Sequence, residues 1–71
     1  MTTIRSEIPA TVWQVKVAAG DHVDADDEII ILESMKMEIP VVAPTSGTIR
    51  AVLVAPDDRV HEGDALAELD Q

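Results

Sequence analysis

The chain has 71 residues, of which 14 are acidic and 5 basic, giving a formal net charge of −9 at neutral pH. This charge argues against nucleic-acid and anionic-membrane partners, which attract proteins mainly through phosphate groups. The absence of cysteine, of a signal-peptide core and of any apolar run near about 18 residues predicts a cytoplasmic protein without disulfides, zinc–thiolate sites or a membrane span.

Short strands separated by turns follow one another along the chain. Apolar and polar residues alternate with period two, and with one Trp and no Phe or Tyr the core must be aliphatic. Such closely spaced strands indicate an all-β sandwich or barrel. In chain order, the predicted strands are residues 12–17, 28–33, 38–42, 49–54 and 65–69, and the predicted turns or loops are 18–21, 43–47 and 55–58.

The sequence contains an internal repeat. A shift of 37 residues aligns residues 11–18 with 48–55 without a gap, and the match continues to Leu32 over Leu69. Each half is too short to bury its own apolar face, so we expect a pseudo-two-fold sandwich in which each half covers the other. Lys36 falls in the connection between the halves.

The segment around Lys36 carries conflicting local signals. Residues 32–39 are good helix formers, but a helix there would be short, uncapped and enclosed by strands. A hairpin that pairs residues 29–32 with 38–42 places Met35, Lys36 or both at its tip. Tight hairpins usually need glycine or asparagine for positive φ, so this sequence predicts a strained turn retained for function.

A lysine at the tip of a stiff hairpin is suited to covalent attachment. The other lysine, Lys16, is predicted to lie within a strand and serves as an internal control. An amine attacks an activated acyl group only when it is deprotonated, whereas nearby carboxylates favour the charged ammonium. Glu33 and Glu38 therefore cannot activate Lys36, and the base must come from a modifying enzyme. We find no nucleophile–base pair, phosphate loop or other catalytic residue.

The segment Glu33-Ser34-Met35-Lys36-Met37 resembles the Ala-Met-Lys-Met attachment motif of biotinyl domains, which Glu usually precedes. Nearly the whole chain is similar to the biotin/lipoyl attachment family, including a repeated Gly-Asp-x-Val and Gly-Asp-x-Leu pattern. Asp26 and Asp57 stand where that family usually has glycine, which aspartate can replace in turns. The resemblance is strongest to small biotin carboxyl carriers.

The resemblance implies a single domain over residues 1–71, a barrel-sandwich hybrid of two antiparallel four-stranded sheets. It implies a non-catalytic carrier, biotinylated by a biotin protein ligase, that carries CO2 as carboxybiotin between biotin carboxylase and carboxyltransferase sites of an acyl-CoA or oxo-acid carboxylase. The cofactor would be covalent biotin, with no metal. The implied site residues are Lys36 for attachment, with Met35, Met37, Glu33 and Ser34 beside it.

Two other functions remain open. Lipoyl acyl carriers share the architecture, but they place Asp before the lysine, so the paired methionines favour biotin. A free-standing biotin reservoir or regulatory decoy is the second alternative. Because the sequence ends at Gln71 without a linker, a carrier of this kind is expected to meet its carboxylase in trans.

Several other residues have simpler predicted roles. His22 and His61 lie in separate repeats and are predicted to be solvated turn residues and not metal ligands. Trp13 is predicted to cover the thin core and not to anchor a partner. Asp21 and Asp58 are predicted to cap equivalent turns by accepting backbone N–H groups.

Overall fold

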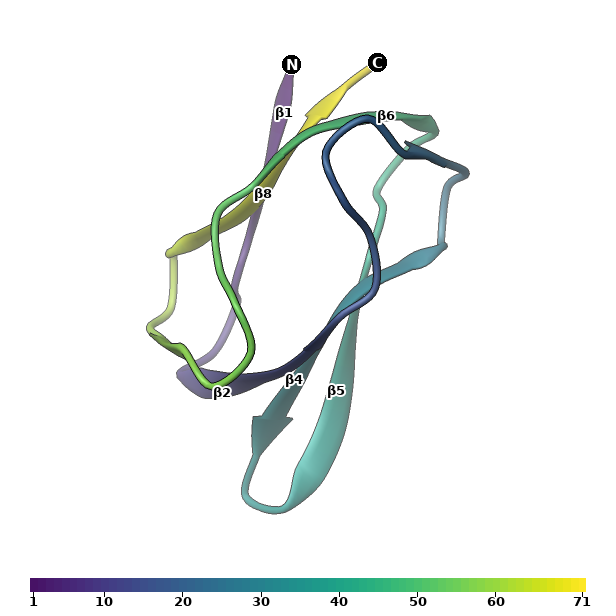
Figure 1. Cartoon of the computed structure of the whole chain (residues 1–71). Helices are drawn as coiled ribbons and strands as arrows, with labels where there is room; N and C mark the ends of the chain where they lie inside the picture. The colour runs from purple at the N-terminus through teal and green to yellow at the C-terminus, as the bar shows by residue number, and fades with distance from the viewer.

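Strands make up all of the regular secondary structure of this protein. The computed structural model describes residues 1–71, and none of it forms a helix long and apolar enough to cross a membrane. Two four-stranded antiparallel sheets, ordered β1-β8-β6-β3 and β5-β4-β2-β7, face each other (Figure 1). The predicted all-β, two-sheet fold is confirmed. The strands are β1 (Thr2–Arg5), β2 (Ala10–Val15), β3 (His22–Val23), β4 (Glu28–Ser34), β5 (Met37–Val42), β6 (Gly47–Val52), β7 (Arg59–Val60) and β8 (Ala65–Asp70).

The sequence repeat corresponds to a pseudo-two-fold symmetry of the structure. Strands β1 to β4 and β5 to β8 are equivalent under the shift of 37 residues, and the pairing of β1 with β8 mirrors that of β5 with β4. The bulge between Val12 and Gln14 recurs between Ile49 and Ala51. Each sheet therefore contains strands of both halves, and neither half contains a complete sheet. The N- and C-termini lie at one end of the molecule and the β4–β5 hairpin at the other (Figure 1).

Three strands were not predicted from the sequence, and two others were predicted at shifted positions. Strands β1, β3 and β7 are short, and the predicted strands at 12–17 and 49–54 each lie two residues too late. Ala10 and Thr11 join β2 because they pair with Val60 and Arg59 of β7, nearly fifty residues away. That partnership leaves no local signal in the sequence.

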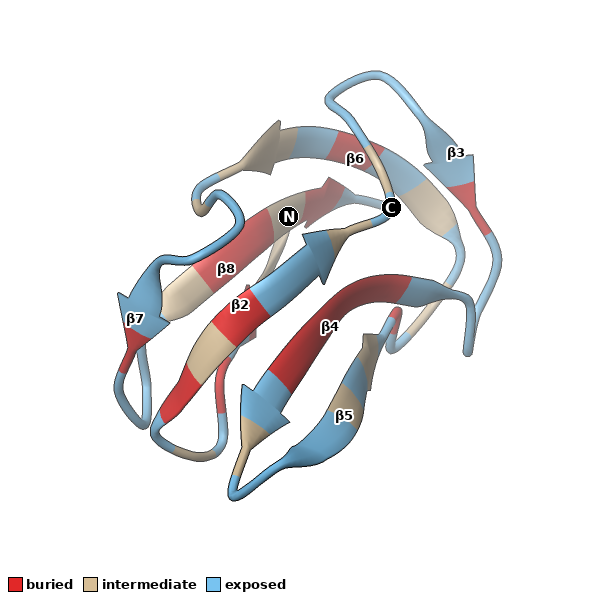
Figure 2. Cartoon of the chain, turned by 60° about the horizontal axis from the view of Figure 1, so that its bottom comes forward, coloured by how far each residue is buried: buried red, intermediate tan, exposed pale blue.

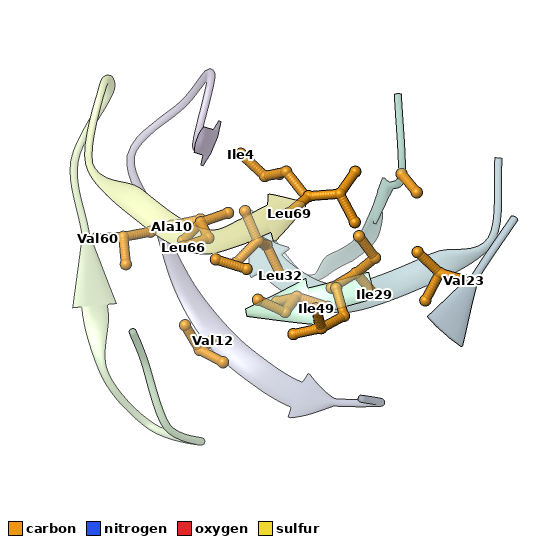
Figure 3. Packing of buried hydrophobic residues seen from close by; sticks show 13 residues of the cluster. Ile4, Ala10, Val12, Val23, Ile29, Leu32, Ile49, Val60, Leu66 and Leu69 are labelled. Carbon is orange, nitrogen blue, oxygen red and sulfur yellow. The ribbon is translucent and has the colours of Figure 1, made fainter. Parts of the chain in front are cut away.

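The core is aliphatic, as predicted. Thirteen buried residues fill the space between the sheets, and Leu32, Ile49 and Leu69 meet at its centre (Figure 3). Red buried segments of β2, β4 and β8 face this space in Figure 2, whereas the turns around them are exposed.

The prediction that Trp13 covers this core is wrong. Its residue surface is 51% exposed, while the preceding Val12 is fully buried. Val12 occupies the inward position of β2 and Trp13 is the extra residue of the bulge, so the indole faces solvent. Arg50 holds the equivalent bulge position in the second half.

Four similar aspartate turns connect the strands. In each, an aspartate carboxylate accepts a hydrogen bond from the backbone N–H three residues earlier, at 2.8 to 2.9 Å. This confirms the capping predicted for Asp21 and Asp58 and extends it to Asp27 and Asp64. The third residue of each turn has positive φ; these residues are Gly20, Asp26, Asp57 and Gly63.

The two histidines lie at the ends of these turns. The side chains of His22 and His61 are 67% and 81% exposed, so both are solvated as predicted, but His22 lies in β3 and not in a turn. His22 Nε2 is 3.5 Å from Asp24 Oδ1, and His61 Nδ1 is 3.6 Å from Asp64 Oδ2. His61 is therefore close to the aspartate of its own turn, whereas His22 is close to the first residue of the turn that follows β3.

Candidate functional site

The β4–β5 hairpin closes through a two-residue turn. Ser34 pairs with Met37, which leaves Met35 and Lys36 as the turn residues. Both have positive φ, 53° and 63°, as the primed turns of tight hairpins require. Left-handed backbone costs a residue with a Cβ about 1 kcal/mol. The predicted hairpin and its strained tip are confirmed.

The hairpin is rigid because its base belongs to the core. Ile29, Ile30 and Leu32 of β4 are essentially fully buried, and Leu32 pairs with the half-buried Ile39 of β5. Beyond this pair the two strands leave the sandwich and carry the turn outward (Figures 1 and 2). The tip therefore projects from a fixed support.

Lys36 is a solitary cation at this tip. It is exposed and takes part in none of the ion pairs of the chain. Lys16, by contrast, lies one residue beyond β2 and not within it, and its Nζ is 2.8 Å from Glu28 Oε1. Of the two lysines, Lys16 therefore has an ion-pair partner and Lys36 has none.

The flanking methionines point away from the core. Met35 is 87% exposed and Met37 59% exposed. Apolar thioethers displayed on both sides of one lysine form an adaptable contact surface for other proteins. Their exposure is too high for side chains that cover the edge of the core.

Glu33 and Glu38 lie opposite each other across the hairpin. Both are exposed, and no cationic side chain pairs with either of them. Glu38 was not predicted as a site residue, although glutamates flank the Ser-Met-Lys-Met segment on both sides. Ser34 is half-buried beside Glu33 and completes the turn with its small side chain.

The arrangement presents an amine without the means to activate it. The site consists of Lys36, two exposed methionines and two carboxylates, on a hairpin that stands clear of the sandwich. It offers neither a nucleophile–base pair nor an enclosed substrate cavity at the tip. An enzyme that acylates Lys36 could reach it from several sides.

Comparisons with known proteins agree with this geometry. Residues 2–69 match the family model described as "Biotin-requiring enzyme", the biotin/lipoyl domain. The chain is 46% identical over 67 residues to a biotin/lipoyl attachment protein of Bacillus subtilis, covering 94% of this chain and 92% of that protein. It is 44% identical over 64 residues to the biotinylated protein TB7.3 homolog of Mycobacterium leprae, covering 90% of each.

A solved structure shows the same fold. Urea carboxylase of Kluyveromyces lactis superposes with a TM-score of 0.91 at 38% identity. The match covers 97% of this chain but 6% of the carboxylase chain. The fold described above is therefore also found as a small part of a much larger enzyme.

Proposed function

The chain belongs to the biotin/lipoyl attachment family, and on that premise we propose that Lys36 is the residue to which its biotin is attached. It is a biotin carboxyl carrier and not an enzyme, and biotin is its covalent cofactor. The observation that carries the assignment to Lys36 is its position as the exposed, unpaired cation of the hairpin turn.

A biotin protein ligase is the proposed modifying partner. The ligase would bring activated biotin and the base that removes the proton from Lys36 Nζ, because the hairpin offers no such base. Nζ would then attack the activated carboxyl carbon of biotin and form an amide, and the activating group would leave with its bonding electron pair. Met35 and Met37 would contact the ligase through their exposed thioethers. Glu33 and Ser34 would help to position the hairpin against the ligase.

Relatives of this chain are carriers or parts of biotin-dependent carboxylases. When attached, biotin supplies a ureido ring that accepts and donates a carboxyl group. We propose that the hairpin presents this ring in trans to a biotin carboxylase and then to a carboxyltransferase. A tether at a projecting tip raises the local concentration of the ring at each site without requiring tight protein–protein binding.

The test is the intact mass of the chain after co-expression with a biotin protein ligase and added biotin. We expect one biotinyl increment in the wild type and in Lys16→Arg, and none in Lys36→Arg. An increment that persists in Lys36→Arg would assign the attachment to another residue. The same comparison with a lipoate ligase addresses the lipoyl alternative, since one relative is named for both cofactors.

A further inference from the structure

The sandwich has an open flank between the edge strands of its two sheets. β1 ends one sheet and β5 ends the other, and each is paired on one side only. Between them lies a groove of about 460 Å³. Leu32 and Ile39, the cross-strand pair at the base of the attachment hairpin, line this groove together with Thr3, Ile8 and Val41.

The groove combines an apolar floor with polar rims. Ile8, Ile39 and Val41 are half-buried and pack against the core, and Leu32 beneath them is 1% exposed. Edge strands present unpaired backbone N–H and C=O groups along their open sides. A ligand suited to this groove has an apolar body and an amide-like edge that both donates and accepts hydrogen bonds.

We propose that the groove is a resting site in cis for the biotinyl group carried on Lys36. This inference rests on the proposed function. The bicyclic ring of biotin has an apolar thioether half, and a ureido half with N–H donors and a carbonyl acceptor. The first half suits the floor formed by Ile39 and Val41. The second suits the open backbone edge of β1, which offers N–H and C=O groups, and that of β5, where Pro40 offers a carbonyl but no N–H.

The arm is long enough to reach the groove. Lysine and the valeryl chain of biotin together span about 14 Å when extended, from standard bond lengths. Ile39 lies three residues from Lys36, which corresponds to about 10 Å along a strand. The ring can therefore enter the hairpin end of the groove while Lys36 remains at the tip.

Docking of this kind is weak and reversible. A short tether gives an effective concentration of roughly millimolar, so a groove with millimolar intrinsic affinity would hold the ring about half of the time. The active sites of partner enzymes then bind the ring in competition with a groove that holds it about half of the time. The accessible fraction of the biotin falls about twofold.

The test compares the amide NMR spectra of the unmodified and biotinylated chains, after intact mass has established the modification. We expect shifts at Ile8, Ile39 and Val41 in addition to those at residues 33–38, with none at Val23 on the opposite flank. Shifts confined to residues 33–38 would overturn the resting site while leaving the proposed function intact. Absence of the biotinyl increment would overturn both.

A groove-filling variant supplies an independent measurement. Thr2→Trp, on the same face of β1 as the buried Ile4, is expected to occupy the groove and to raise the rate of capture of the biotinylated chain by streptavidin about twofold. Thr48→Trp, at an exposed position of β6 outside the groove, is the matched control and should be captured at the wild-type rate. Equal capture rates for all three chains would contradict the proposal.

Discussion

Glu33 and Glu38 face each other on β4 and β5, one pair below the Ser34–Met37 pair that closes the hairpin turn. Neither carboxylate is matched by a cationic side chain. Like charges directly opposite one another on adjacent strands destabilise a sheet. The hairpin therefore carries an unfavourable pair beside the proposed attachment residue, as expected if partner proteins supply the missing positive charge.

Removing one member of this pair should stabilise the folded chain. We expect Glu38→Gln to raise the free energy of unfolding by about 0.5 kcal/mol at low ionic strength. The gain should shrink at 1 M salt, where the screening length is about 3 Å. Urea denaturation at both salt concentrations measures this, with the loop variant Glu62→Gln as control. A gain that is independent of salt would rule out charge repulsion as its cause.

Replacing Met35 with glycine should raise the stability of the chain but lower its rate of biotinylation. Met35→Gly removes a Cβ at φ 53° and is expected to stabilise the chain by about 0.5 kcal/mol, since glycine adopts this conformation freely but loses more entropy. Biotinylation should nevertheless slow, because the exposed thioether is lost. Asp57→Gly, at φ 76°, is the control and should be biotinylated at the wild-type rate. Unchanged modification of Met35→Gly would show that the ligase does not use Met35.

The contribution of the aspartate hydrogen bond to a turn can be measured with two substitutions at the same position. In Asp64→Ala the N–H of His61 loses its side-chain acceptor, at a cost of about 1 kcal/mol in unfolding free energy. Asp64→Asn keeps an acceptor oxygen and should lose much less. Asp27, the equivalent residue of the first half, should behave in the same way. If the asparagine and alanine variants are equally unstable, the hydrogen bond is not what stabilises the turn.

The exposure of Trp13 predicts a small contribution to stability. Trp13→Ala should cost less than about 1 kcal/mol, whereas Val12→Ala, at a fully buried neighbouring position, should cost about 2 kcal/mol. Because Trp13 is the sole tryptophan, its fluorescence reports the same property. Acrylamide should quench it readily in the native state, and a protected, blue-shifted emission would contradict the exposed placement.

The repeat and the hairpin could be predicted because both leave regular traces in the sequence. A gap-free shift of 37 residues required two equivalent halves, and apolar residues on both sides of residues 33–38 required a turn between paired strands. The chemistry of the tip followed from the residue types around Lys36. The aspartates at positions 26 and 57 were correctly expected to tolerate turn conformations, and both adopt positive φ.

The amino-acid sequence by itself determined the aliphatic core, the two-fold repetition and the segment that carries Lys36, since these depend on composition and local periodicity. The tertiary structure alone decided the short strands, the outward placement of Trp13 and the groove between β1 and β5. These depend on contacts between distant residues, such as the pairing of Thr2 with Leu69. Register across such distances is set by how both sheets close over one core, a property that no local window of the chain contains.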